Sequence, residues 1–271
     1  MPELPEVETT LRGIAPYLEG QKIRALSVRQ PKLRFPVPPQ LAENICGKSI
    51  LSCQRRAKYL LLHLSTGSVI IHLGMSGSLR LFQSALPEAG KHDHLDLHLE
   101  NGTTLRFHDP RRFGAWLWQE KGKVHSVFKQ LGKEPLDADF TPHYLHQSLS
   151  RRTIPIKSAL MDNKIVVGIG NIYANEALFR SFIHPNRPAK TLTLTECHTL
   201  IATIRAVLLR AIEVGGSTLR DFVDSHGNSG YFQQEYAVYG REGLACKRCQ
   251  QTIERVLMAG RSTFFCPHCQ S

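Results

Sequence analysis

The sequence predicts an α+β fold in three parts: an N-terminal β-sandwich with a leading helix, a C-terminal helical domain, and a short metal-binding β-hairpin. Alternating apolar residues between turn signals dominate the first half of the chain. Apolar residues at helical spacing dominate the second half. Four of the seven cysteines lie together at the C-terminal end. A chain of 271 residues is long enough for two domains and a small appendage.

The leading helix is expected from about Pro5 to Leu18, because proline suits the first helical turn and Gly20 can end the helix. Its apolar residues recur at helical spacing: Val7, Leu11, Ile14 and Leu18.

Strands are expected from Ile23 to about Trp118. Residues 59–64 and 69–73 flank a Thr66-Gly67 turn, and residues 95–99 alternate between leucine and polar residues before an Asn101-Gly102 turn. Residues 1–130 therefore predict a β-rich domain, either a sandwich or a flattened barrel.

Residues 131–150 contain scattered glycine and proline and predict a linker. Helices are expected in 151–240, where Thr193 and Glu196 have the spacing of a capping box and Gly215-Gly216 ends the helix that follows. Residues 241–271 form the metal-binding module.

The chain carries a formal net charge of +11, which favours a polyanionic partner. It has no apolar run of about 18 residues, which argues against a membrane span, and its acidic, proline-rich N-terminus is unlike a signal peptide. We therefore expect a cytoplasmic monomer that requires no protein partner.

The cysteine spacing predicts one structural zinc ion. Cys246-x2-Cys249 and Cys266-x2-Cys269 are separated by sixteen residues, and two such pairs can supply four thiolates to a tetrahedral Zn²⁺. A redox or accidental cluster is the alternative. Arg261 lies at the tip of the hairpin expected between the pairs, where it is either a solvated loop arginine or a phosphate contact.

Several motifs together resemble bacterial formamidopyrimidine-DNA glycosylases (Fpg), which are related to endonuclease VIII. The resemblance covers essentially the whole chain. Its motifs are PELPEVE (2–8), RRAKYL (55–60), HLGMSGSL (72–79), HDH (92–94), DPRRFG (109–114), MDNK (161–164), GIGNIY (168–173) and the four cysteines.

This resemblance implies a DNA glycosylase and abasic-site lyase that removes oxidised purines such as 8-oxoguanine and formamidopyrimidines. Once Met1 is removed, the amine of Pro2 would attack the sugar, and an α-amino group is less basic than lysine by about two pKa units. Glu3 would donate a proton to the sugar ring oxygen. Lys58 would act in β-elimination and Arg261 in δ-elimination. Without the family, Pro2 would be a residue that merely precedes a helix.

The resemblance also implies how damaged double-stranded DNA is held. Met75, Arg111 and Phe113 would fill the space left by a flipped nucleotide, although methionine and phenylalanine more often lie in cores. A helix–two-turn–helix element would bind DNA, and a loop from Ser217 to about Tyr236 would cap the lesion. The remaining DNA contacts would be His92, Arg152, Lys157, Asn171 and Arg220.

Two other functions remain open. Oxidised pyrimidines could be the substrate, although endonuclease VIII typically begins Pro-Glu-Gly rather than Pro-Glu-Leu as here. A non-catalytic zinc-ribbon DNA-binding protein would need none of Pro2, Glu3 or Lys58. Three further cysteines have no evident role and are expected to be buried thiols: Cys46, Cys53 and Cys197.

Overall fold

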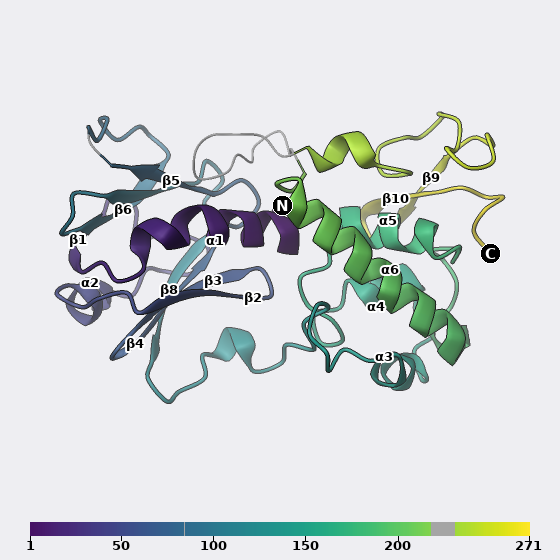
Figure 1. Cartoon of the computed structure of the whole chain (residues 1–271), viewed down its shortest axis with the longest axis horizontal. Helices are drawn as coiled ribbons and strands as arrows, with labels where there is room; N and C mark the ends of the chain where they lie inside the picture. Colours follow the sequence, from purple (N-terminus) through teal and green to yellow (C-terminus); the bar gives the residue numbers. More distant parts are fainter. Residues whose placement is uncertain (84, 218–230) are drawn as a thin grey trace. The chain divides into compact units, whose positions relative to one another are not determined.

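The computed structural model describes residues 1–83, 85–217 and 231–271, so Arg220 and most of the expected lesion-capping loop lie outside the described residues. The chain divides into two compact units (Figure 1). Unit 1 comprises Met1–Lys129 and Val214–Tyr231, and unit 2 comprises Gln130–Glu213 and Phe232–Ser271. In the described ranges, no helix is both long enough and apolar enough to cross a bilayer.

Unit 1 is built on two four-stranded antiparallel sheets, as the sandwich prediction required. The first has the strand order β1-β6-β7-β5 and the second β2-β3-β4-β8. The bounds are β1 (Ile23–Val28), β2 (Ser52–Arg56), β3 (Tyr59–Leu64), β4 (Gly67–His72), β5 (Ser78–Phe82), β6 (Asp93–Leu99), β7 (Thr104–His108) and β8 (Ala115–Glu120).

One apolar core joins both sheets and the leading helix α1 (Leu4–Leu18). Leu60 and Leu62 of β3 and Leu95 and Leu97 of β6 are fully buried in it, because alternate residues of a strand point to the same face. The alternation predicted for residues 95–99 is confirmed. Helix α1 contributes Val7, Leu11, Ile14 and Leu18 to this core.

Smaller elements complete unit 1. Helix α2 (Leu41–Ile45) packs beside β1, and the 3-10 helix η1 (Ser126–Phe128) places Phe128 against Tyr59 on the outer face of β3. Cys46 and Cys53 are half-buried against the core, which is less burial than expected.

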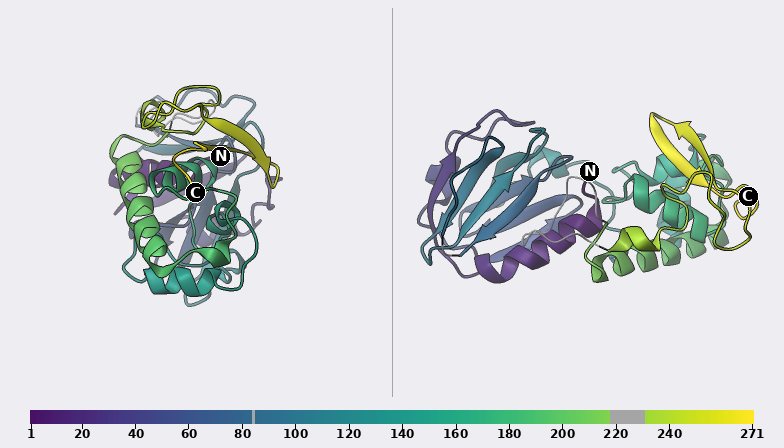
Figure 2. Two further views of the ribbon diagram at one scale, coloured as in Figure 1. Left: turned by 90° about the vertical axis from the view of Figure 1, so that its right-hand side faces the viewer. Right: turned by 90° about the horizontal axis from the view of Figure 1, so that it is seen from above.

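Unit 2 is mainly helical and ends in a two-stranded hairpin (Figure 2). Thr193 and Glu196 form the predicted capping box: Thr193 N donates to Glu196 Oε2 at 2.8 Å, and Glu196 N donates to Thr193 Oγ1 at 3.2 Å. The bounds are α3 (Pro142–Leu149), α4 (Ile156–Leu160), α5 (Asn171–Arg180), η2 (Ala189–Thr191), α6 (Leu194–Glu213), η3 (Phe232–Glu235), β9 (Glu254–Met258) and β10 (Arg261–Phe265).

The segment 131–150, expected to be a linker, contains helix α3 and packs within unit 2. Thr141 caps the helix by accepting from Tyr144 N at 3.2 Å, and Pro142 occupies the first helical position. Leu145 and Leu149 are buried, so the eight-residue helix packs against α6. Helix α3 is too short to show a periodic pattern in the sequence, which is why the proline and polar residues of the segment predicted a linker.

A buried carboxylate ties helix α5 to the segment that leads into the cysteine module. Glu176 is fully buried and accepts from the backbone N–H groups of three consecutive residues at 3.0 Å each: Ala237, Val238 and Tyr239. Three charge-assisted bonds satisfy a buried carboxylate well.

Candidate active site

The N-terminus of helix α1 is fixed by two acidic residues. Glu3 is the N-cap residue, and its N–H donates to Glu6 Oε2 at 2.8 Å. The other oxygen of Glu6 accepts from Ser217 N at 2.8 Å. Glu3 is 3% exposed and Glu6 is completely buried. The first helical turn is therefore bound to a residue from the far end of unit 1.

Met1 is present in the structure, so the nitrogen of Pro2 is part of a peptide bond and is not a nucleophile. The free amine is that of Met1, one residue from the predicted reactive atom. Burial lowers its pKa, Glu3 and Glu6 raise it, and Lys58 and Arg111 lower it further. These charged groups thus surround the end of the chain.

Lys58 is brought to this region by the turn between β2 and β3. It is only 8% exposed and follows Ala57, which adopts a left-handed conformation with φ of 55°. The guanidinium of Arg55 donates to Ala57 O at 3.1 Å and to Glu8 Oε2 of helix α1 at 3.0 Å. Arg55 therefore ties the Lys58 turn to the leading helix.

A second loop of unit 1 presents Arg111 and Phe113. Asp109 is fully buried, and its carboxylate accepts from Gly114 N at 2.8 Å and from Arg111 N and Ser76 Oγ at 3.3 Å each. Phe113 is 43% exposed, and the Arg111 guanidinium lies 5.1 Å from its ring centroid. One buried carboxylate thus fixes the backbone of the loop that carries these two exposed side chains.

Met75 belongs to a neighbouring loop that fits tightly against the first. A Cβ on Gly74 would lie 2.5 Å from Gly114 N, so this close approach requires glycine at position 74. Met75 is 38% exposed and lines a pocket of about 360 Å³ with Met1, His72 and Phe113. The alternative in which Met75 and Phe113 are core residues is therefore wrong.

His72 lies in the wall of this pocket. Its Nδ1 accepts from Gly74 N at 3.0 Å. Burial, together with the positive charges of Arg34 and Lys58, lowers the pKa of His72 to about 4. The imidazole is therefore neutral at physiological pH, and its shape and hydrogen bonding fix the start of the Met75 loop.

His92 is half-buried beside a carboxylate–histidine pair. Its ring lies edge-on to His108, with centroids 5.9 Å apart. His108 Nδ1 is 2.7 Å from Asp93 Oδ1, and this bond lowers the pKa of Asp93 against the opposing effect of burial. His92 is therefore supported by a rigid neighbour on β7.

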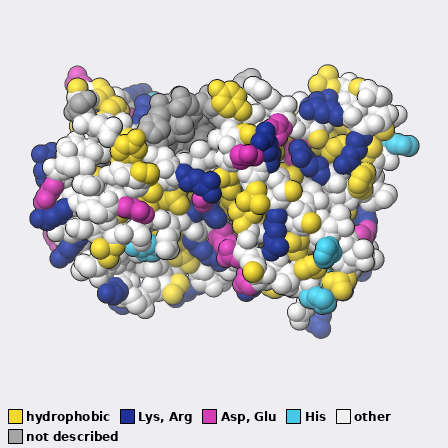
Figure 3. Space-filling view, viewed as in Figure 1, with side chains coloured by type: hydrophobic (Ala, Val, Ile, Leu, Met, Phe, Trp, Pro, Cys, Tyr) yellow, Lys and Arg dark blue, Asp and Glu magenta, His cyan; other side chains and the backbone are white. Residues whose placement is uncertain are grey.

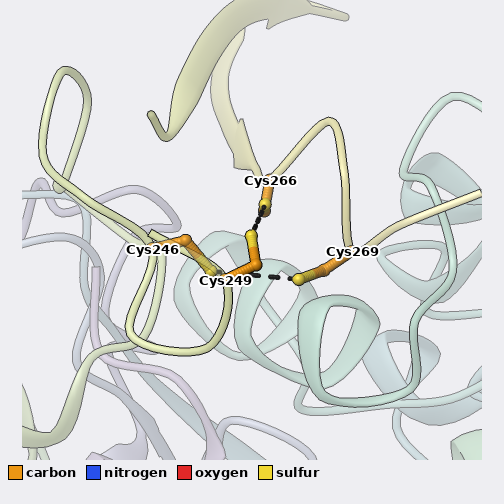
Figure 4. Close-up of side chains that lie close together, drawn as sticks. All are labelled: Cys246, Cys249, Cys266 and Cys269. Atoms are coloured by element: carbon orange, nitrogen blue, oxygen red, sulfur yellow. Dashed lines mark hydrogen bonds between the residues drawn. The ribbon is translucent and has the colours of Figure 1, made fainter. Parts of the chain in front are cut away.

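The four C-terminal cysteines of unit 2 form the predicted metal site (Figure 4). All four Sγ atoms lie within 4.8 Å of one another, with Cys249 and Cys266 3.5 Å apart and Cys246 and Cys269 4.0 Å apart. Four sulfurs at about 2.3 Å from Zn²⁺ would be about 3.8 Å apart. The site therefore fits a tetrahedral zinc ion with no position left for a catalytic ligand.

The hairpin between the cysteine pairs carries Arg261. Strands β9 and β10 are joined by Ala259 and Gly260, both with positive φ, and Arg261 pairs with Met258. The side chain of Arg261 is exposed. The tight two-residue turn places Arg261 at the start of β10, as predicted.

Lys157 does not reach solvent in the way that a phosphate contact would, whereas Asn171 is half-buried. Lys157 is 2% exposed, and its Nζ donates to Thr263 Oγ1 at 2.6 Å and to Ser262 O at 3.2 Å. The phosphate contact predicted for Lys157 disagrees with this burial. Asn171 Nδ2 donates to Ser262 O at 2.9 Å, and its half-buried side chain starts helix α5.

Arg152 is held more loosely. Its guanidinium donates to Asp162 Oδ2 at 3.0 Å and to Ser148 O at 3.1 Å. The side chain is 36% exposed, so the ion pair with Asp162 leaves part of the guanidinium accessible. Exposed pairs of this kind contribute little to stability.

Positive charge is present on both units. Figure 3 shows Lys and Arg side chains on the visible face of each, with Asp and Glu beside several of them. Together with the net charge of +11, this distribution is typical of a protein that binds a polyanion.

Comparison with known proteins identifies the family. Residues 1–116 match the formamidopyrimidine-DNA glycosylase N-terminal domain, residues 131–223 match the formamidopyrimidine-DNA glycosylase H2TH domain, and residues 243–271 match a zinc finger found in FPG and IleRS. The chain belongs to the formamidopyrimidine-DNA glycosylase family. The resemblance to the Fpg family and the predicted α+β fold class are therefore confirmed.

Full-length relatives of this Fpg-family chain agree. Formamidopyrimidine-DNA glycosylase of Hydrogenovibrio crunogenus is 56% identical over 271 residues, covering 100% of this chain and 96% of that protein. The enzyme of Neisseria meningitidis is 53% identical and matches over the full length of both chains.

Solved Fpg structures share the fold. The Fpg protein of Thermus thermophilus is 42% identical with a TM-score of 0.89, covering 99% of this chain and 98% of that one. A Lactococcus lactis Fpg variant, solved with DNA containing Fapy-dG, is 36% identical with a TM-score of 0.92 and covers all of both chains. With the zinc finger match and the four-cysteine geometry, one structural zinc belongs to this Fpg-family fold.

Several residues that fix the candidate site residues within each unit were not found from the sequence. Asp109 lay within a recognised motif, but nothing in the motif indicated which donors it accepts from. Glu176 and Thr263 gave no signal, because their partners lie 61 and 106 residues away along the chain. Glu6 had only its capping position as a signal, and its bond to Ser217 was not expected.

Proposed function

We propose that this chain is a base-excision-repair enzyme that removes oxidised purines from double-stranded DNA and then cleaves the abasic site. The observation that carries the proposal is the charged surroundings of the chain's terminal amine, which include Glu3, Lys58 and Arg111. Burial, the largest influence on the pKa of the Met1 amine, acts with these two cations to favour the neutral, nucleophilic form, whereas Glu3 and Glu6 oppose it. We also propose that the enzyme acts in the cytoplasm.

The reactive amine is that of Pro2 after removal of Met1. Its nitrogen attacks C1′ of the damaged nucleotide while the base leaves with the electrons of the glycosidic bond. Glu3 donates a proton to the sugar ring oxygen, which opens the ring and leaves an iminium linkage. The iminium accepts electrons during elimination of the flanking phosphates, with Lys58 serving β-elimination and Arg261 serving δ-elimination.

The same proposal assigns the DNA contacts. Phe113 and Met75 enter the space left by the flipped nucleotide, which their exposure permits, and Arg111 hydrogen-bonds the unpaired base opposite. His92, Arg152 and Asn171 contact phosphates. The half-buried side chain of Asn171 can do so only at the start of helix α5, where backbone N–H groups also favour an anion.

Borohydride trapping on a duplex with an abasic site tests this chemistry. Protein shown by N-terminal sequencing to begin at Pro2 should form a covalent DNA adduct, because borohydride reduces the iminium to a stable amine. Protein that retains Met1 is the matched control and should form none. Equal trapping by the two samples would refute the role of Pro2, and no adduct from either would indicate a non-catalytic DNA-binding protein.

Relative excision distinguishes the substrate classes. Faster release from 8-oxoguanine:C duplexes than from thymine-glycol duplexes is expected. The reverse order would instead identify oxidised pyrimidines as the preferred substrate.

A further inference from the structure

A buried ammonium group contacts strand β10 of the hairpin between the two cysteine pairs. Lys157 of helix α4 is 2% exposed, and Thr263, which accepts its hydrogen bond, is completely buried. Moving an ammonium group out of water costs several kcal/mol unless hydrogen bonds compensate it. A lysine in this position is poorly placed to bind a phosphate, and its Nζ donates to a carbonyl and a hydroxyl of β10.

The contacts of Lys157 continue to Arg261. Thr263 Oγ1 accepts from Lys157 Nζ at 2.6 Å and lies 3.3 Å from Arg261 O, to which it donates. A hydroxyl has one hydrogen, so accepting from the ammonium leaves that hydrogen for the carbonyl. A two-step chain of hydrogen bonds therefore joins helix α4 to the backbone of Arg261.

Ser262, which lies between Arg261 and Thr263, is held by hydrogen bonds as well. Ser262 O accepts from both Lys157 Nζ at 3.2 Å and Asn171 Nδ2 at 2.9 Å. Further along β10, Phe264 N donates to Asn175 Oδ1 at 2.8 Å. Consecutive residues of β10 are thus fixed by helices α4 and α5, whereas the turn before Arg261 consists of two small residues with positive φ.

We propose that Lys157 and Thr263 are positioning residues that set the backbone of Arg261 for the δ-elimination step. This inference rests on the proposed function of Arg261. Instead of binding DNA, Lys157 directs the hydroxyl of Thr263 toward Arg261 O and holds Ser262. The long, exposed arginine side chain then starts from a backbone with one conformation, which lowers the entropy lost when it reaches its phosphate.

Thr263→Val and Thr263→Ser form the matched pair that tests it. Valine keeps the shape of threonine and removes the hydroxyl, whereas serine keeps the hydroxyl. On a duplex with an abasic site, Thr263→Val should slow δ-elimination about tenfold relative to β-elimination, and Thr263→Ser should remain close to the unmodified protein. Zinc content of one per chain confirms that the hairpin is folded in each. Equal product ratios for the Val and Ser variants would overturn the proposal.

Lys157→Met tests the same inference through salt dependence. A lost phosphate contact would reduce the slope of log Kobs against log salt concentration by about 0.9. A positioning residue leaves the slope unchanged while the ratio of δ to β product falls. A reduced slope for Lys157→Met would show a direct DNA contact and overturn the assignment.

A double-mutant comparison separates this inference from the function beneath it. Arg261→Ala alone should abolish most δ-elimination, and adding Thr263→Val should then have no further effect, because Arg261 is the residue positioned. An additional tenfold loss would overturn the positioning role and leave the role of Arg261 intact. Unchanged δ-elimination in Arg261→Ala alone would instead refute the proposed role of Arg261, and the positioning role with it.

Discussion

Two loops that carry candidate DNA-contacting residues are held in place by different kinds of contact. In unit 1, the loop with Arg111 and Phe113 is held by Asp109, two to five residues away along the chain. In unit 2, the hairpin with Arg261 is held by four cysteines and by Lys157, which is 105 and 106 residues from its partners. Most bonds of the Asp109 carboxylate join neighbouring residues, whereas the hairpin depends, besides its own cysteines, on a lysine 105 and 106 residues from its partners.

The difference follows from where each loop can find an apolar core. The Asp109 loop lies between two sandwich strands, β7 and β8, whose buried residues already fix its ends. The hairpin has only two strands, which are marginally stable alone, and strand β9 is mostly exposed. Its conformation therefore depends on the metal and on bonds to helices α4 and α5, in addition to a small apolar cluster in which Phe264 packs with Phe179.

Zinc removal should produce the largest effect, and it tests whether the hairpin of unit 2 depends on the metal. A structural zinc contributes on the order of 10 kcal/mol or more to the folding of a small module. Chelation, or Cys249→Ser, should unfold the hairpin and abolish δ-elimination and DNA binding. Both tryptophans lie in β8 of unit 1, so their fluorescence transition in urea should be unchanged.

Measured zinc content must accompany that experiment. Full activity after verified loss of zinc would show that the hairpin is held by Lys157, Asn171 and Asn175 without the metal. A shifted tryptophan transition would show that the two units do not unfold independently.

Asp109→Ala should produce the next largest effect, now in unit 1. It would leave the N–H groups of Gly114 and Arg111 and the hydroxyl of Ser76 without their acceptor, at about 1–3 kcal/mol for each buried donor. A loss of about 3–5 kcal/mol in the free energy of unfolding is expected from urea titration followed by tryptophan fluorescence. The zinc content should not change.

Glu100→Ala provides the control, because Glu100 is an exposed residue of the same unit whose side chain forms an exposed ion pair with Lys22 at 2.9 Å. Its effect should be within about 0.5 kcal/mol. Similar losses for Asp109→Ala and Glu100→Ala would contradict the central role given to the Asp109 carboxylate.

Acid should have a smaller effect on unit 1, through His72. Its pKa is lowered from 6.5 to about 4, so between these values the unfolded chain binds a proton that the folded chain does not. The free energy of unfolding is therefore unaffected by the titration of His72 above pH 6.5. It falls as the pH is lowered toward 4, by at most about 3 kcal/mol. Protonation also removes the acceptor for Gly74 N.

His72→Asn isolates this contribution, because its amide oxygen can accept a hydrogen bond but does not titrate in this range. The free energy of unfolding, followed by tryptophan fluorescence from pH 7 to pH 4, should fall less steeply for the variant. Parallel curves for the two proteins would show that His72 does not titrate differently in the folded state.

The elements with regular patterns could be predicted from the sequence. Helix α1, the alternating strand β6 and the capping box of α6 all follow from residues within one or two turns of each other. The cysteine spacing predicted the metal site for the same reason. Helix α3 was missed because its eight residues are too few to show a period.

The candidate site residues could be predicted where they lie in motifs. They could not be predicted where their surroundings depend on bonds between residues far apart in the sequence. Met75 and Phe113 were indicated by resemblance, and their residue types alone favoured a core. The burial of Lys157 could not be predicted, because its partner Thr263 is brought near only by the docking of β10 on the helices. Polar pairs distant in sequence leave no periodic signal.

The bond between Glu6 and Ser217 spans 211 residues and bears on biosynthesis. A ribosome releases the sandwich strands long before it reaches position 217, so the N-terminal turn of α1 must wait for helices α3 to α6 to emerge before this acceptor is satisfied. Translation order and folding order therefore differ within one unit. The first turn of α1, among the first residues to be made, therefore gains this hydrogen bond only after most of the chain has been synthesised.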